Sequence, residues 1–409
     1  MASAPSEPES TYAWLRLCAS LALMTIGGVG MYGMAVALAP VQAEFGASRG
    51  DASLPYTLTM IGFGIGGILM GKLADRFGVV VPVIIGAFGL GGGLVLAGSA
   101  PNLLVFSLAH GILIGMLGCA TTFAPLVADT ALWFNRRRGV AVAICASGNY
   151  LAGAIWPPIL QYSFDTVGWR PTYIGVGIFC TAAMLLLALA LRRRPPALDS
   201  PAHAIHLRTF AERPLGLSPN ALMTLLAIAG VACCVAMSMP QVHIVAYCGD
   251  LGYGAARGAE MLSIMLAAGI VSRLASGWIC DHIGGLRTLL LGSALQGIAL
   301  VLFLPFDGLV SLYVVSAMFG LFQGGIVPSY AIIVREHFPP REAGVRTGIV
   351  LMATLFGMAF GGWVSGAIFD LTGSYRAAFI NGIAWNVLNL TIAFSLLRRA
   401  RRPGVPAPA

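Results

Sequence analysis

The octapeptide GKLADRFG spans Gly71–Gly78, and a related octapeptide, GWICDHIG, occurs at Gly277–Gly284. Glycine, aspartate and glycine recur at the first, fifth and eighth positions of both copies. All three pairs are separated by 206 residues (277 − 71 = 281 − 75 = 284 − 78). Each copy lies in a short polar break between long apolar runs. A shared offset of this length predicts that the chain is built from two copies of one membrane unit.

The composition is typical of a protein embedded in a lipid bilayer. Hydrophobic residues make up 58% of the 409 residues, charged residues make up 10%, and the mean hydropathy is +0.85. Soluble domains carry roughly 25% charged residues. About twelve apolar stretches, including Leu15–Ala39 and Leu103–Val127 as the first and fourth, are long enough to cross a hydrocarbon core of about 30 Å. We therefore predict an all-α polytopic membrane protein, with about twelve transmembrane helices in two pseudo-symmetric six-helix bundles.

A polar segment rich in proline and arginine, beginning RRRPPALDSP at residue 192, separates the two halves. It predicts an N-terminal bundle at residues 1–191, a cytoplasmic linker at 192–218, a C-terminal bundle at 219–397 and a cytoplasmic tail at 398–409. Most cations fall in the linker, the tail and the loops of one side, and the other side keeps only Arg49, Arg170, Arg257 and Arg376. The positive-inside rule then places both termini in the cytoplasm. The net charge of +8 is scattered over short loops, so we expect no nucleic-acid partner.

The repeated octapeptide resembles the loop signature of the major facilitator superfamily, which joins the second and third helices and has a weaker copy between the eighth and ninth. The resemblance implies the fold of that superfamily, which transports substrates by alternating access. It also implies that Asp75, Arg76 and Asp281 belong to a gate that holds the cytoplasmic side closed. The alternative for these residues is a plain helix cap that anchors the topology.

Three further stretches resemble monocarboxylate transporters. WFNRRRGVAVAICASGNYLAG at Trp133–Gly153 is similar to the segment that enters their fifth helix. The stretches Tyr32–Ser53 and Met239–Gly252 are similar to the ends of their first and seventh helices. Two features of the animal members are missing, namely the acidic, glycine- and tryptophan-rich start of the first helix and a lysine late in that helix, where Val36 stands. Because bacterial relatives, including oxalate/formate-type exchangers, often lack both, the resemblance implies a bacterial homologue in the cell inner membrane.

Arg273 is the one basic residue well inside a predicted span, roughly 12 Å along the helix from Asp281 at 1.5 Å per residue. An arginine at this depth is costly, and it normally faces a cavity on a substrate path. No acid neighbours it on its helix, and none is predicted deep in another span. A guanidinium binds a carboxylate through two parallel hydrogen bonds, so an anionic substrate is the expected partner. The resemblance also implies a substrate-binding arginine on the eighth helix. The alternative is an arginine held by backbone carbonyls or by Ser272 and Ser276.

A single substrate cation favours a monoanion over a dianion. The lysine that oxalate-type exchangers carry in the eleventh helix has no counterpart, because Thr347–Phe369 contains no Lys, Arg or His. A dianion would be left half-neutralised in a site of low dielectric constant. If protons are coupled, His243 and His110 titrate nearest to neutral pH, and His243 is the better candidate for a relay. A hydrogen-bonded packing role is an equally good interpretation of His243.

Polar and aromatic side chains on other helices are candidates for shaping the pocket. They are Tyr32 on the first helix, Thr121 on the fourth, Asn149 on the fifth, and Gln323 and Tyr330 on the tenth. The two tyrosines rank first, because the resemblance places their helices along the cavity. Tyrosines at the membrane interface or in helix packing are the alternative.

These observations favour a secondary transporter of small monocarboxylates, such as lactate- or pyruvate-like anions, that works as a monomer in a lipid bilayer with proton symport. A carboxylate exchanger, an exporter of a neutral or amphipathic compound, and a non-transporting sensor are the alternatives. An enzyme is disfavoured, because the sequence has no nucleophile–histidine–acid set, metal motif or phosphate-binding loop. For the same reason we expect no cofactor and no metal.

Overall fold

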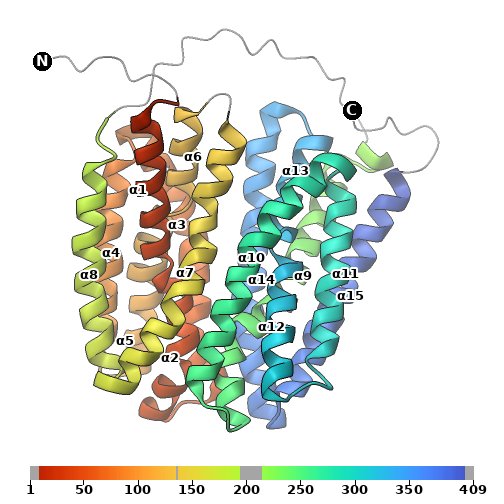
Figure 1. Ribbon diagram of the computed structural model, residues 1–409. Helices are drawn as coiled ribbons and strands as arrows, with labels where there is room; N and C mark the ends of the chain where they lie inside the picture. The colour runs from red at the N-terminus through yellow and green to blue at the C-terminus, as the bar shows by residue number, and fades with distance from the viewer. Residues whose placement is uncertain (1–8, 135–136, 194–213, 401–409) are drawn as a thin grey trace, which may run out of the picture. The chain divides into compact units, whose positions relative to one another are not determined.

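The computed structural model describes residues 9–134, 137–193 and 214–400, which are almost entirely helical (Figure 1). In this part of the chain twelve helices are long and apolar enough to cross a membrane, which confirms the predicted multi-pass fold. The chain divides into two compact units. Unit 1 comprises Met1–Asp199 with Ile244–Ser263, and unit 2 comprises Ser200–His243 with Ile264–Ala409. Most of the expected linker, at 194–213, and most of the expected tail, at 401–409, lie outside the described residues.

Unit 1 contains the six spans of the first repeat. Its elements are α1 (Thr11–Gly27), α2 (Val29–Phe45), α3 (Arg49–Phe77), α4 (Val80–Gly98), α5 (Leu103–Leu108), the π-helix η1 (Ala109–Cys119), α6 (Ala124–Trp133), α7 (Arg138–Val167) and α8 (Trp169–Leu189). α4 packs between α8 and η1, α3 packs on η1, and α1 packs on α7. Glycine permits this close packing. A Cβ on Gly62 of α3 would lie only 2.0 Å from the carbonyl oxygen of Gly111 in η1.

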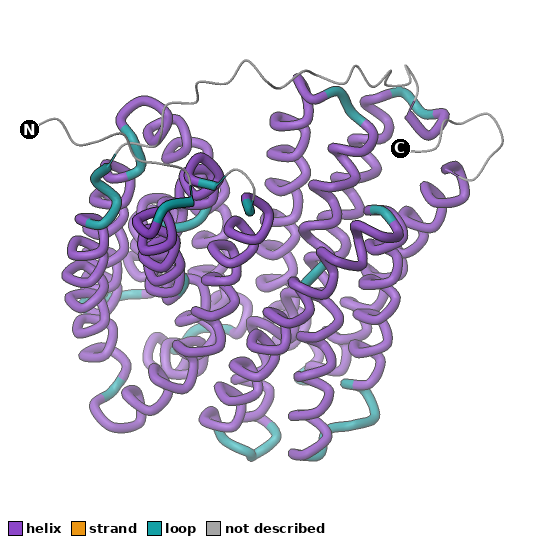
Figure 2. The backbone as a smooth tube through the Cα atoms, turned by 45° about the horizontal axis from the view of Figure 1, so that its top comes forward, coloured by secondary structure: helices purple, strands orange, loops and turns teal. Residues whose placement is uncertain are grey.

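Unit 2 contains most of the second repeat. Its elements are η2 (Pro214–Gly216), α9 (Pro219–Asp250), α10 (Ala255–Ile283), α11 (Gly285–Leu302), α12 (Leu309–Gln323), α13 (Ile326–His337), α14 (Pro340–Thr372) and α15 (Tyr375–Ala400). The end of α9 and the start of α10, at Ile244–Ser263, belong to unit 1. α11 packs on α12, α13 and α15, and α14 packs on α13 and α15. Figure 2 shows how few of the described residues lie outside helices.

The repeat inferred from the octapeptides is present in the backbone. α3 and α10 have the same length, and both of their ends are offset by the interval that separates the octapeptides (255 − 49 = 283 − 77 = 277 − 71). Each is followed by a glycine with positive φ and extended ψ, with φ 83° and ψ 165° at Gly78 and φ 82° and ψ 164° at Gly284. A side chain at these torsion angles would clash with the backbone, so the position requires glycine.

Three spans are interrupted. The first, expected as one uninterrupted helix, breaks at Gly28 between α1 and α2. The fourth runs on to Trp133 rather than ending near Val127, and it breaks between η1 and α6. The tenth breaks between α12 and α13 at Gly324–Gly325, which we call the tenth-span break. Irregular backbone inside a membrane is tolerated where it is buried in protein or lines a cavity.

Candidate functional site

In unit 2, the turn of α10 that carries Arg273 packs against the tenth-span break. A Cβ on Gly324 would lie 2.5 Å from the carbonyl oxygen of Gly269, and one on Gly325 would lie 1.8 Å from Oγ of Ser276. Arg273 follows Gly269 by four residues and precedes Ser276 by three, so all three share one side of the helix. The Arg273 side chain is half-buried, and its Nε is shielded from solvent. The structure therefore brings Arg273 and the tenth-span break to the same level of unit 2.

The break places the start of a buried half-helix at mid-span. Gln323 ends α12 and is the middle residue of the tenth span, Leu309–His337 (323 − 309 = 337 − 323). α13 then begins at Ile326 after the N-cap residue Gly325, and no side chain caps it. Unpaired N–H groups and the helix dipole make such a start electropositive. Transporters use half-helix N-termini near the bilayer midplane to hold anionic groups of substrates.

Gln323 is held by a partner that the sequence did not predict. Its Oε1 accepts a hydrogen bond of 2.9 Å from Nε2 of Gln241 on α9. Gln323 is 1% exposed and Gln241 is 7% exposed. Within the described residues, Nε2 of Gln323 has no hydrogen-bond partner. A buried amide donor without a partner is costly, and it is an unusual feature of a folded interior.

Tyr330, the second candidate on the tenth span, is fully buried and engaged inside unit 2. Its hydroxyl donates to Oδ1 of Asn389 on α15 at 3.0 Å. Nδ2 of Asn389 donates in turn to Oγ of Ser293 on α11 at 2.7 Å. The tyrosine thus ties α13 to α11 and α15.

His243 is buried at the junction of three helices in unit 2. Its Nε2 lies 2.8 Å from the carbonyl oxygen of Gly362 on α14, and its Nδ1 lies 3.0 Å from the hydroxyl of Tyr375 on α15. A carbonyl only accepts hydrogen bonds, so Nε2 carries the proton and Nδ1 accepts from Tyr375. A neutral imidazole is fully satisfied by these two contacts.

The three remaining pocket candidates belong to unit 1. Asn149 lines a small cavity where the first-span break at Gly27–Gly28 meets the break in the fourth span. Thr122 lines the same cavity. The predicted Thr121 points elsewhere, because a Cβ on Gly86 of α4 would lie 1.9 Å from its Oγ1. Tyr32 of α2 is buried.

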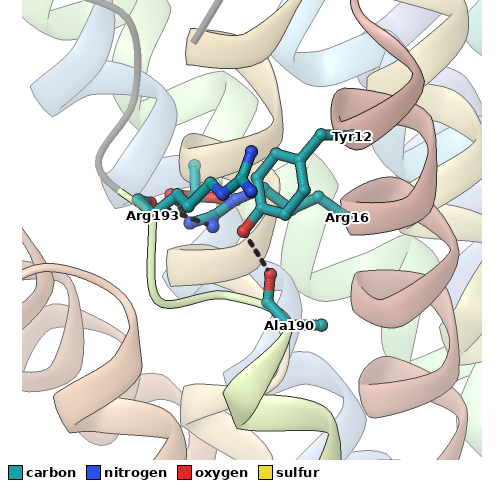
Figure 3. A network of polar contacts seen from close by, with 5 residues as sticks. Tyr12, Arg16, Ala190 and Arg193 are labelled. Atoms are coloured by element: carbon teal, nitrogen blue, oxygen red, sulfur yellow. Dashed lines mark hydrogen bonds and ion pairs between the residues drawn. The ribbon is translucent and has the colours of Figure 1, made fainter. Parts of the chain in front are cut away.

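A buried acid that the sequence did not single out lies near the end of the fourth span. Asp129 is buried in α6, because the fourth span extends past it to Trp133. Nε and Nη2 of Arg16 donate to its two carboxylate oxygens, both at 2.8 Å. The third nitrogen, Nη1, donates to the carbonyl oxygen of Arg193 at 3.2 Å, and the Tyr12 hydroxyl donates to Ala190 O nearby (Figure 3). The pairing offsets part of the desolvation cost of the buried carboxylate.

The proposed gate residues lie at the ends of α3 and α10. Asp75, Arg76 and Asp281 are exposed. The guanidinium of Arg76 lies 5.2 Å from the ring centre of Phe77. Among the described residues neither aspartate forms an ion pair or caps a helix, so the cap interpretation finds no support there. Instead, Glu336 accepts a hydrogen bond of 2.9 Å from the backbone N–H of Gly285 and caps α11.

Comparisons with known proteins agree with this architecture. Monocarboxylate transporter 13 of Bos taurus is 28% identical over 340 residues, which cover 80% of this chain and 75% of the relative. The transporter asaE of Aspergillus flavus is 25% identical over 310 residues, covering 75% and 68%. The crystal structure of a mutant of the nucleoside transporter NupG shares the fold, with a TM-score of 0.73, 14% identity and coverage of 95% and 99%. The model of the Major Facilitator Superfamily matches residues 18–312 and 261–409. The chain is therefore a membrane transporter that belongs to the Major Facilitator Superfamily.

Proposed function

We propose that the protein transports small monocarboxylates, such as lactate- or pyruvate-like anions, by alternating access. The observation that carries the proposal is the packing of the Arg273 turn against the tenth-span break. A guanidinium and an uncapped half-helix start then lie at one level near mid-span, and both favour a carboxylate. The similarity to proteins named monocarboxylate transporters supports the same substrate class.

The charge at this level favours a monoanion. Arg273 supplies one full positive charge, and the start of α13 adds a partial one of about half a charge. A single carboxylate would be neutralised, whereas the second carboxylate of a dianion would stay charged in a medium of low dielectric constant. We assign a polar contact of the substrate to Gln323 in unit 2, with Tyr330 bracing the tenth span. Tyr32 and Asn149 of unit 1 stay predicted contacts, and Thr121, whose side chain faces α4, is dropped from them.

We further propose that a proton moves with the anion, that the protein acts as a monomer in a bacterial inner membrane, and that both termini are cytoplasmic. His243 is the candidate relay, because protonation of Nδ1 would turn it from an acceptor into a donor toward Tyr375. Asp75, Arg76 and Asp281 are the proposed cytoplasmic gate. Carboxylate exchange is the alternative mode. Export of a neutral or amphipathic compound is the alternative substrate class.

The test is uptake of labelled lactate, pyruvate, acetate and formate into proteoliposomes containing Arg273→Gln or Arg273→Lys. Loss of a desolvated charge partner costs about 2–5 kcal/mol, so we expect Arg273→Gln to reduce uptake at least about 30-fold. Lysine, which lacks the bidentate fork of arginine, restores only part of it. Arg287→Gln is the matched control, because Arg287 is exposed on α11. Undiminished uptake by the Arg273 variants would refute the assignment.

Uptake measurements in the same proteoliposomes distinguish proton symport from carboxylate exchange. An inward proton gradient drives accumulation by a symporter, and it is without effect on an exchanger. Preloading with unlabelled carboxylate at equal pH accelerates an exchanger strongly. Failure of every carboxylate, together with transport of a neutral compound, would favour the exporter.

A further inference from the structure

The pair formed by Gln241 and Gln323 is a feature of unit 2 whose geometry goes beyond the contact that the proposed function assigns to Gln323. Both amides are buried within membrane spans, 82 residues apart in sequence, and they share one hydrogen bond of 2.9 Å. Buried side-chain amides are retained in an apolar interior when each polar atom is satisfied. In the described part of the chain, Nε2 of Gln323 is not satisfied by protein.

The hydrogen bond fixes which atom of Gln323 remains available. Because Oε1 of Gln323 accepts from Gln241, the carboxamide plane is held and its NH₂ group points away from Gln241. Turning over the amide of Gln323 alone would bring two NH₂ groups together and break the bond, so a reversed bond requires both amides to turn together. Gln241 is thus a positioning residue that presents a donor, not an acceptor, at the end of α12.

The place of this donor connects it to the proposed substrate. Gln323 directly precedes the tenth-span break, and Gly324 of the break packs on Gly269 and Ser272 of α10, next to Arg273. A carboxylate bound by Arg273 and the start of α13 therefore has an amide donor in its neighbourhood. A second oxygen on the substrate, on the carbon beside the carboxylate, would give that donor an acceptor.

We propose that Gln323, oriented by Gln241, determines specificity by donating Nε2–H to a 2-oxo or 2-hydroxy oxygen of the monocarboxylate. This inference rests on the proposed function. It predicts that the protein binds 2-oxo and 2-hydroxy acids more tightly than acids with no oxygen at that carbon, because an acid without this oxygen leaves Nε2–H of Gln323 without an acceptor. The discrimination lies in the ratio of affinities and not in the affinity for the carboxylate itself.

The experiment measures dissociation constants of pyruvate, lactate and propionate for the purified full-length protein, by ligand-induced thermal stabilisation. Wild type should bind pyruvate and lactate more tightly than propionate. Gln323→Met should lower both ratios about fivefold, since a neutral hydrogen bond is worth a factor of roughly 2–10, and should leave propionate unchanged. Gln241→Met should lower both ratios by a smaller factor, and the double variant should not exceed Gln323→Met.

The control is Gln296→Met, because Gln296 is also fully buried in unit 2 but donates to the carbonyl oxygen of Cys233. It should keep the wild-type ratios even if the protein becomes less stable. If Gln323→Met does not fold, Gln241→Met decides the matter, because it leaves Gln323 in place and releases only its orientation.

Unchanged ratios in both variants, with binding that still depends on Arg273, would overturn this inference and leave the proposed function intact. A variant that weakens lactate but not pyruvate would also overturn it, because a 2-oxo oxygen only accepts hydrogen bonds and the group read by Gln323 would then be an acceptor. Absence of any carboxylate binding by wild type would overturn the proposed function, and this inference with it.

Discussion

The ion pair between Arg16 and Asp129 should be among the most strongly coupled pairs in the protein. The two side chains are 3% and 7% exposed, and two charge-assisted hydrogen bonds of 2.8 Å join them. Each such bond contributes about 1.5–3 kcal/mol. Removal of one partner strands the other charge, at a cost of about 3–5 kcal/mol. Removal of both charges avoids that cost, so apolar replacements at both positions should be tolerated better than at one.

The assay is a double-mutant cycle with Arg16→Met and Asp129→Leu, measured as the free energy of unfolding in SDS titrations of mixed micelles. We expect each single variant to lose about 3–5 kcal/mol and the double variant about 2 kcal/mol or less, which gives a coupling energy of about 3 kcal/mol or more. The control cycle is Arg257 and Glu260, which are 54% and 43% exposed and should couple by less than about 0.5 kcal/mol. Additive losses at Arg16 and Asp129 would refute the reasoning.

Three further outcomes are expected. Gly320→Ala should lose more than about 2 kcal/mol of stability or fail to fold, because its Cβ would lie 1.8 Å from the carbonyl oxygen of Met265. The control Gly277→Ala, which has open space around it, should cost less than about 0.5 kcal/mol in the same titration. Tyr375→Phe should cost about 1–3 kcal/mol, because it removes the hydroxyl that donates to Nδ1 of the buried His243. A wild-type unfolding curve would contradict this role of the hydroxyl. Asp75→Asn should slow uptake in vesicles with a stability change below about 0.5 kcal/mol, because the side chain is exposed, and an unaltered uptake rate would exclude it from the gate.

The fold was predictable because it depends on local signals. Apolar length gives the number of spans, and the interval between the octapeptides recurs at both ends of α3 and α10. The breaks were not predictable. Gly28 and the pair Gly324–Gly325 stand among 52 glycines, and others such as Gly62 and Gly320 meet a neighbouring helix just as closely without a break.

The candidate site was predictable in its residue types and not in its pairings. Arg273 and Gln323 were both chosen from the sequence, and their segments meet at the tenth-span break. Their chemistry alone did not identify Gln241, which lies 82 residues away on another helix. Asp129 was missed for the same reason, since its partner is 113 residues away. A sequence gives the face of a helix on which a residue lies, but not which face of another helix it meets.

The corners at Gly78 and Gly284 agree within one degree in both backbone torsion angles, although all five residues between the shared glycines and aspartates differ. Divergence after duplication has altered the chemistry of the two turns and kept their shape. A chimera that exchanges the two octapeptides would therefore transplant charge and aromatic character without bending the chain differently. Because the backbone of both turns is the same, a change in transport by such a chimera would report on the side chains of the turn and not on its backbone conformation.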